Sequence, residues 1–180
     1  MNSLSILFVF IVLTLIFMDF IRNLFGKLFG KNRNRMNIAV LVDGPNIIRK
    51  EFNVDLNKVK TEVEKYGEIR VAKIYLDQHA RDKLIEAVIN QGFEVEITTG
   101  DVDVTMAIEG MEYVLNPNID AIALITRDTD YRPLLIKARE RGKKTIIVAT
   151  DVAFSAALKN TADNVIIIRD NVAEHIKVHK

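Results

Sequence analysis

The sequence contains no cysteine and no tryptophan, and only three histidines, three prolines and eight glycines among its 180 residues. Without cysteine the chain cannot form a disulfide, an iron–sulfur cluster, a cysteine-based zinc site or a thiol nucleophile. Three scattered histidines leave little for a zinc site or a Ser-His-Asp triad. The low proline and glycine contents exclude collagen-like and proline-rich chains. What remains in quantity is aliphatic side chains and carboxylates.

The length and the 49% content of apolar residues predict one folded domain rather than a disordered chain. The net charge is +1, but it is unevenly distributed. Residues 1–35 hold five bases against one acid, whereas the remainder holds 20 bases against 23 acids. A slightly acidic body is not held on nucleic acid by bulk charge, so any such contact must be local.

The N-terminus is a long hydrophobic run. Residues 4–18 carry no charge, and Phe20 and Ile21 extend the run past Asp19 to about 18 residues, near the lower limit for crossing a bilayer. A cleaved signal peptide would need a basic start and a small-residue cleavage site, which the sequence lacks; a buried core helix is the other alternative. We therefore predict a transmembrane anchor over residues 1–21.

Five bases follow this anchor and none precedes it. The positive-inside rule then predicts a single-pass protein of the cell membrane whose C-terminal domain is cytoplasmic. Residues 22–35 are expected to form a basic juxtamembrane linker, lying on the lipid surface or simply solvated. Met36 is an alternative start, and the anchor would then not be part of the protein.

Residues 36–170 alternate short aliphatic runs with amphipathic segments. We expect strands at residues 37–42, 69–76, 93–97, 121–125, 145–149 and 165–168. We expect helices at residues 55–65, 80–90, 103–115, 131–140 and 155–159. This alternation predicts a three-layer α/β/α, Rossmann-like fold with a mainly parallel sheet and right-handed crossovers. Residues 171–180 are expected to be a C-terminal tail.

Acidic residues follow three of the predicted strands. They are Asp43 after the first strand, Asp101 and Asp103 after the third, and Asp128 and Asp130 after the fourth. Because the carboxyl ends of parallel strands share one edge of the sheet, we expect these acids to converge there. Each alone would be an ordinary helix cap, but neighbouring like charges destabilise a fold unless a cation neutralises them. Oxygen-only ligands suit Mg²⁺ or Mn²⁺, which promote the attack of water on phosphodiesters.

Four motifs relate this pattern to a known family. They are Asp43-Gly44-Pro45-Asn46, Asp101-Val102-Asp103-Val104, Thr126-Arg127-Asp128-Thr129-Asp130-Tyr131 with Pro133-Leu134, and Ser155-Ala156-Ala157-Leu158 before Ala162-Asp163. Through them, residues 37–169 resemble the NYN domain, a LabA-like branch of the PIN-like nuclease superfamily, and within it an archaeal subgroup. The resemblance implies a PIN-like fold and metal-dependent endoribonuclease activity. It also implies RNA as the partner, one or two Mg²⁺ or Mn²⁺ ions as the cofactor, and pairing into a homodimer as an option.

The resemblance also implies the site residues. The catalytic set would be Asp43, Asp103, Asp128, Asp130 and Asn46, and the metal ligands would be the same four aspartates with Glu109. Asn46 would orient Asp43 or a water molecule at the metal. Glu109 comes six residues after Asp103, about 100° away from the helix face that a spacing of seven would share. A solvated helix acid is therefore the alternative for Glu109.

Residues that would bind substrate are Thr126, Arg127, Arg132 and Ser155. Many relatives have Ser-Gly where this chain has Thr126-Arg127, and Arg127 would either clamp a phosphate or neutralise neighbouring acids. Basic residues between 132 and 144 form either a strip for the RNA backbone or a solvated helix face. Two other functions stay open. One is a non-catalytic scaffold that binds nucleic acid or protein. The other is a phosphatase, for which Pro45 stands where a second aspartate is needed.

Overall fold

The computed structural model describes residues 35–47, 55–149, 156–169 and 172–178, together with Thr14, Phe17, Met18 and Ile21. The chain divides into two units, Met1–Asn34 and Arg35–Lys180. Apart from those four positions, the predicted anchor over residues 1–21 lies outside the described residues, as does most of the linker over residues 22–35. Among the residues that are described, no helix combines the length and the apolar character needed to cross a bilayer. The anchor therefore stays a prediction.

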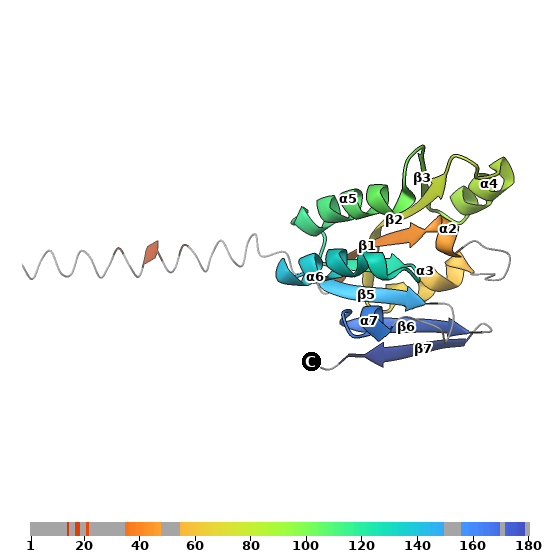
Figure 1. Ribbon diagram of the computed structural model, residues 1–180. Coiled ribbons are helices and arrows are strands. Elements are labelled where there is room, and N and C mark those ends of the chain that lie inside the picture. Colours follow the sequence, from red (N-terminus) through yellow and green to blue (C-terminus); the bar gives the residue numbers. More distant parts are fainter. Residues whose placement is uncertain are drawn as a thin grey trace, which may run out of the picture. The chain divides into compact units, whose positions relative to one another are not determined.

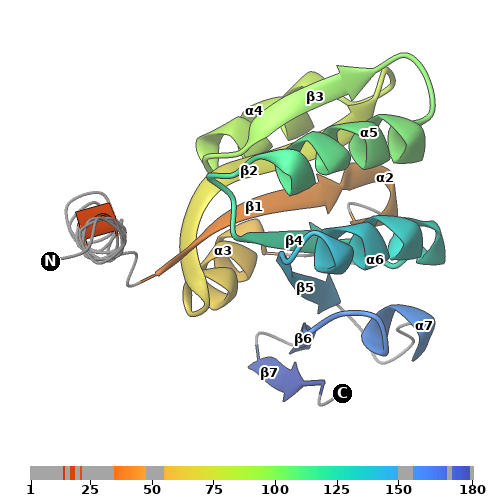
Figure 2. The same cartoon turned by 90° about the vertical axis from the view of Figure 1, so that its left-hand side faces the viewer.

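One sheet forms the middle of the second unit. Its strands are β1 (Met36–Asp43), β2 (Gly67–Asp77), β3 (Glu94–Thr98), β4 (Ala121–Ile125), β5 (Lys144–Ala149), β6 (Asn164–Arg169) and β7 (Val172–Lys177). Their order in space is β3-β2-β1-β4-β5-β6-β7 (Figures 1 and 2). All neighbouring strands pair in parallel except β6 and β7, which are antiparallel. The predicted mainly parallel sheet is confirmed.

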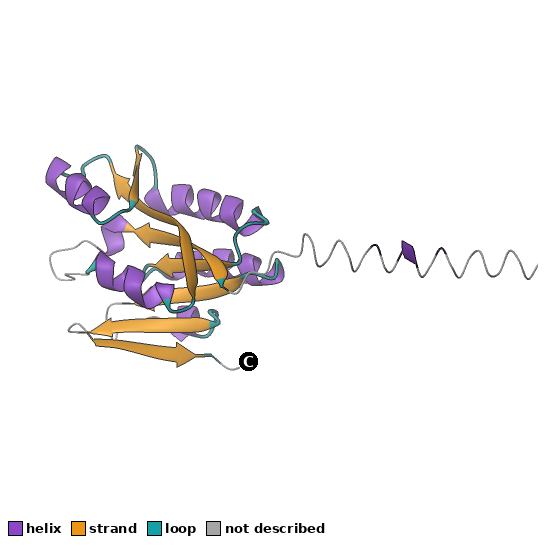
Figure 3. Ribbon diagram, turned by 180° about the vertical axis from the view of Figure 1, so that it is seen from behind, coloured by secondary structure: helices purple, strands orange, loops and turns teal. Residues whose placement is uncertain are grey.

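Helices cover both faces of this sheet. They are α2 (Gly44–Ile47), α3 (Leu56–Glu64), α4 (Asp82–Asn90), α5 (Val102–Leu115), the 3₁₀ turn η1 (Thr129–Tyr131), α6 (Arg132–Glu140) and α7 (Ala156–Lys159). Apolar residues of α3 and α4 pack on one face, and those of α5, α6 and α7 pack on the other. Figures 2 and 3 show the strands as the layer between these helices. The three-layer α/β/α prediction is therefore confirmed.

The predicted strands and helices agree with the observed ones to within two residues at each end. The central strands β1, β4 and β5 are found because each contains a continuous apolar run, as parallel strands buried on both faces should. All five residues of β4, for example, are buried. The prediction of a C-terminal tail over residues 171–180 is corrected, because residues 172–177 form β7. Its sequence, VAEHIK, is neither a continuous apolar run nor a regular alternation.

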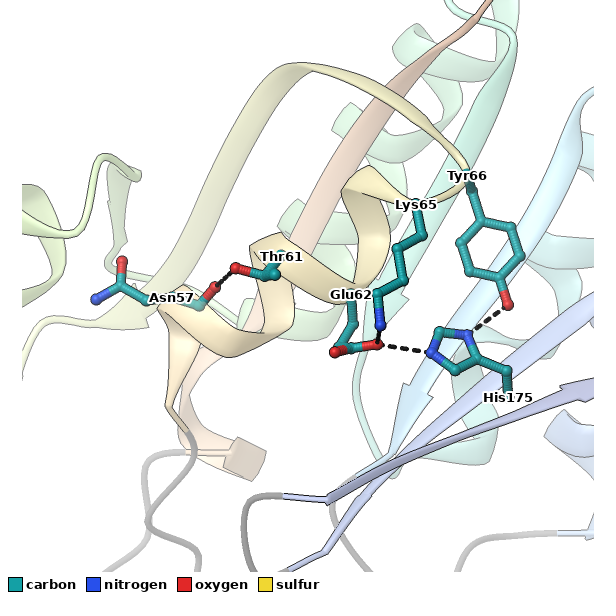
Figure 4. A network of polar contacts seen from close by, with 6 residues as sticks. All are labelled: Asn57, Thr61, Glu62, Lys65, Tyr66 and His175. Carbon is teal, nitrogen blue, oxygen red and sulfur yellow. Dashed lines mark hydrogen bonds and ion pairs between the residues drawn. The ribbon is translucent and has the colours of Figure 1, made fainter.

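A polar side-chain network fastens β7 to α3 (Figure 4). Glu62 Oε2 accepts a hydrogen bond from Lys65 Nζ at 2.6 Å and lies 2.6 Å from His175 Nε2. The other ring nitrogen of His175 lies 2.8 Å from the Tyr66 hydroxyl. The hydrogen bond from Lys65, against the effect of burial, lowers the pKa of Glu62. The network lies where α3 leads into β2, at the amino end of that strand.

Candidate active site

The strand order reverses between β1 and β4, because the chain continues from β1 to β2 and β3 and then returns to the other side of β1. In open α/β sheets, the crevice at the carboxyl ends of such a strand pair is the usual ligand site. Val42 of β1 pairs with Ile125 of β4. The next residues, Asp43 and Thr126, therefore lie side by side at the carboxyl ends of β1 and β4. We call this place, where the strand order reverses, the switch point of the sheet.

Asp43 is fully buried at the end of β1. Its Oδ2 accepts hydrogen bonds from Asn46 Nδ2 at 2.6 Å and from Thr126 Oγ1 at 2.9 Å. Its Oδ1 accepts one from the Asn46 backbone N–H at 3.2 Å. Burial raises the pKa of Asp43, the bonds from Asn46 and Thr126 oppose that change, and the nearby Asp103 carboxylate adds to it. Asp43 is thus a desolvated acid whose charged form is only partly stabilised by the protein.

Gly44 allows the chain to turn directly after Asp43. A Cβ atom at this position would lie 2.5 Å from the Tyr75 carbonyl oxygen and would collide with Leu76 Cδ2. No other residue fits between α2 and β2 at this point without displacing the backbone of β2. The Asp43-Gly44-Pro45-Asn46 motif therefore has a physical basis. Glycine starts the short helix α2, and α2 brings Asn46 back to the carboxylate.

Thr126 links the two strands of the switch point. It is fully buried, and its hydroxyl donates to Asp43 and accepts a hydrogen bond of 3.1 Å from the Asp128 N–H. The hydroxyl predicted to contact substrate is thus engaged within the protein. One side chain holds both the β1 aspartate and the start of the loop after β4.

Asp103 comes to the same place from α5. Its Oδ1 accepts a hydrogen bond of 2.7 Å from the hydroxyl of Tyr131, a residue of η1 that is only 1% exposed. The pKa of Tyr131 is raised, first by burial and then by the negative charges of Asp43, Asp103 and Asp128. Three of the predicted aspartates therefore act electrostatically on one phenol, which stays protonated and donates a hydrogen bond to one of them, Asp103. Sequence reasoning did not assign Tyr131 to the site; its place directly after Asp128-Thr129-Asp130 was the available signal.

Asp128 and Asp130 occupy the loop after β4. Asp128 precedes η1, and its Oδ1 accepts a hydrogen bond of 2.9 Å from the Asp130 N–H. Asp128 is half-buried, whereas Asp130 is exposed. The helix-cap reading of Asp128 is therefore correct for one of its oxygens. It does not exclude a second role for the carboxylate, which is near enough to influence Tyr131.

Glu109 lies in a different polar cluster. Its Oε2 accepts hydrogen bonds from Lys73 Nζ at 2.7 Å and from the Tyr75 hydroxyl at 2.9 Å. Lys73 also forms an ion pair of 2.9 Å with Glu96. Burial alone would lower the pKa of Lys73, but the bonds to Glu109 and Glu96 raise it. A cation already neutralises Glu109, so we leave this residue out of the proposed site.

Two of the predicted substrate-binding residues, Thr126 and Arg132, are engaged with other side chains of the protein. Arg132 Nε donates to Thr161 Oγ1 at 3.2 Å, and Ser155 lies outside the described residues. Arg127 is half-buried in the loop after β4. In the basic stretch, Lys143 Nζ donates to the carbonyl oxygens of Asn116 and Ile119, at 2.8 and 2.6 Å. Lys143 immediately precedes β5, so it lies at the amino end of the sheet, opposite Asp43.

The donor set of the site consists of oxygens. Within the described ranges, no group of three or more acidic or histidine side chains is arranged so that it could hold a metal ion. Mg²⁺ is commonly bound through one or two carboxylates and keeps several water molecules or substrate phosphates as further ligands. Asp43 and Asp103, which interact electrostatically, fit this mode of binding better than a cage of four aspartates.

Comparisons with known proteins agree with this architecture. The family model described as "NYN domain" matches residues 37–169. The uncharacterized protein MJ0482 of Methanocaldococcus jannaschii is 52% identical over 149 residues, which cover 81% of this chain and 62% of that protein. This chain thus spans less than two thirds of the length of that relative. A crystal structure of a protein of unknown function, VPA0982 from Vibrio parahaemolyticus, matches with a TM-score of 0.67 and 24% identity. That match covers 78% of this chain and 97% of the other, and it concerns the fold.

Proposed function

The chain belongs to the NYN domain family and has its PIN-like nuclease fold, and from that premise we propose that it is a divalent-metal-dependent endoribonuclease. Nucleases of this kind typically use divalent metal ions. The observation that carries the proposal is the placement of three acidic residues at the switch point of the sheet. Thr126 bonds both Asp43 and the Asp128 N–H, and Tyr131 bonds Asp103, which is near enough to Asp43 to raise its pKa. A buried acid and its charged neighbour are a costly arrangement, and the cost falls when a cation is present.

Each side chain of the site would have a separate role in RNA hydrolysis. Asp43 and Asp103 would hold a Mg²⁺ or Mn²⁺ ion. When bound, such an ion neutralises the carboxylates and stabilises the charge that develops on the phosphate. Asn46 and Thr126 keep Asp43 oriented through three hydrogen bonds to its two oxygens. Asp130, the exposed acid of the loop, is assigned to accept the proton of the attacking water.

The test is RNA cleavage by the full-length chain in Mg²⁺, Mn²⁺ or EDTA. We expect cleavage that EDTA abolishes and that Asp43→Asn and Asp103→Asn reduce to near background. Glu140→Gln is the matched control, because Glu140 ends α6 just before the amino end of β5, on the opposite side of the sheet from Asp43, where it pairs with Lys137. Glu109→Gln should retain activity if Glu109 is only the partner of Lys73 and Tyr75.

A catalytically silent scaffold is the second candidate. It is favoured by the finding that, among the residues described, no three acidic or histidine side chains are arranged so that they could hold a metal ion. Absence of EDTA-sensitive cleavage across several types of RNA would support this role. RNA that binds with similar affinity in EDTA and in Mg²⁺ would identify the scaffold as a nucleic-acid-binding one.

We further propose that residues 1–21 anchor the protein in the cell membrane with the nuclease domain in the cytoplasm. The support is the uncharged run over residues 4–18 and the five bases that follow it. The protein should sediment with membranes, and a reporter fused after Lys180 should resist protease added to intact cells. Full-length protein in the soluble fraction would contradict the anchor and would favour Met36 as the start.

A further inference from the structure

We propose that the Tyr131 hydroxyl is a positioning group that holds the Asp103 carboxylate beside Asp43, an inference that rests on the function proposed above. The hydroxyl donates to Asp103 Oδ1 at 2.7 Å. It reaches from η1, after β4, to the first turn of α5. The contact therefore joins the two segments that deliver Asp128 and Asp103 to the switch point.

Asp103 needs such a constraint because of its place in α5. It is the second residue of the helix, where a carboxylate ordinarily stays near the free N–H groups of its own first turn. Asp101 already fills that role, since its Oδ1 accepts a hydrogen bond of 2.9 Å from the Asp103 N–H. The Asp103 side chain is directed instead to a residue 28 positions later in the chain.

Electrostatic repulsion from Asp43 acts on the same side chain. Without a constraint, this repulsion would move half-exposed Asp103 toward solvent, because Asp43 is buried and cannot move away. A hydrogen bond from a neutral donor to a charged carboxylate is among the stronger polar contacts in proteins. By bonding Oδ1, the Tyr131 hydroxyl offsets the repulsion and leaves Oδ2 for a cation.

The ring of Tyr131 is held independently of its hydroxyl. It is buried in the core cluster of the α5 and α6 face, together with Val102 and Met106. Phenylalanine at this position would therefore keep the packing and remove only the hydrogen bond. Tyr75 supplies the matched control: it is fully buried, and its hydroxyl donates to another α5 carboxylate, Glu109, at 2.9 Å.

The experiment measures Mn²⁺ binding to the full-length chain by isothermal titration calorimetry. Loss of a contact that orients a metal ligand typically weakens metal binding by about 10- to 100-fold. We expect Tyr131→Phe to raise the Kd for Mn²⁺ by about 10-fold or more, and Tyr75→Phe to change it by less than about 2-fold. Combined with Asp103→Asn, Tyr131→Phe should have no further effect, because the hydroxyl acts through Asp103.

Two results would overturn the inference. One is a Tyr131→Phe affinity within about 2-fold of the wild type; the other is an equal effect of Tyr131→Phe with and without Asp103. A wild-type chain that binds no Mn²⁺ would instead overturn the proposed metal site. The positioning role would then be decided by thermal unfolding without metal. There, non-additive shifts in Tm for Tyr131→Phe and Asp103→Asn support it, and additive shifts refute it.

Discussion

The hydroxyl of Thr126 offers a direct test of how Asp43 is held in the core. Thr126→Val keeps the shape of the side chain and removes two hydrogen bonds. One is the 2.9 Å bond that the hydroxyl donates to Asp43 Oδ2, and the other is the 3.1 Å bond that it accepts from the Asp128 N–H. A hydrogen bond to a charged group contributes about 1.5–3 kcal/mol, and one between neutral groups about 1 kcal/mol. Because both bonds are lost, we expect the variant to lose about 2.5–4 kcal/mol of unfolding free energy when Asp43 is ionised.

The loss should depend on pH in a defined direction. The folded pKa of Asp43 is raised above its ordinary value of 3.8, so its carboxyl contributes stability at low pH that is lost as pH rises through the folded value. The Thr126 bond lowers that pKa, so removing it raises the pKa further. The difference between Thr126→Val and wild type should be about 2 kcal/mol below pH 3.8, where both lost bonds join neutral groups, and should grow as pH rises through the folded pKa.

Urea unfolding of the full-length chain, followed by far-ultraviolet circular dichroism between pH 3 and pH 8, measures this difference. Thr145→Val is the matched control, because Thr145 is also fully buried and donates to an aspartate, Asp163, at 2.8 Å. It should be destabilised to a similar extent without altering Mn²⁺ binding. A Thr126→Val variant whose loss of stability is the same at every pH would refute the reasoning about Asp43.

Mn²⁺ at a hundredfold excess over its Kd should add about 2.7 kcal/mol of stability and raise Tm by about 5–10 °C in scanning calorimetry; an unchanged Tm would contradict a metal site. Gly110→Ala should lower the free energy of unfolding, measured in urea, by about 1 kcal/mol. The new Cβ would lie 2.6 Å from Leu134 Cδ2, and the destabilisation from this overpacking exceeds the stabilisation from the higher helix propensity of alanine. A more stable variant would show that Leu134 and α6 can shift to make room for the added methyl group. Glu62→Gln should cost about 1 kcal/mol at pH 7. The lowered pKa of Glu62 means that this stabilisation is present above pH 4.5 and is lost as pH falls through the folded value. An equal cost at pH 3 would contradict that assignment.

The sequence by itself determined the layers of the fold and the edge at which the acids gather. Runs such as β4 are apolar throughout because both faces of a parallel strand are buried, and that property can be read from neighbouring residues. The connection rules for parallel strands then bring Asp43 and Asp128 to one edge without any knowledge of side-chain contacts. The motif around Asp43 is local only in part: Asn46 bonds the carboxylate three residues before it, whereas Gly44 is required by the close approach of β2.

Only the tertiary structure decided which side chains meet at that edge. Thr126 reaches Asp43 across 83 residues, and Tyr131 reaches Asp103 across 28. Such pairs depend on how α5 and the loop after β4 pack on the sheet, and no periodicity in the sequence encodes them. The same holds for Glu109, which shares a helix with Asp103 but is neutralised by Lys73 of β2. Which side chains of different helices and strands meet depends on how these elements pack. The role of each carboxylate could therefore be assigned only from the tertiary structure.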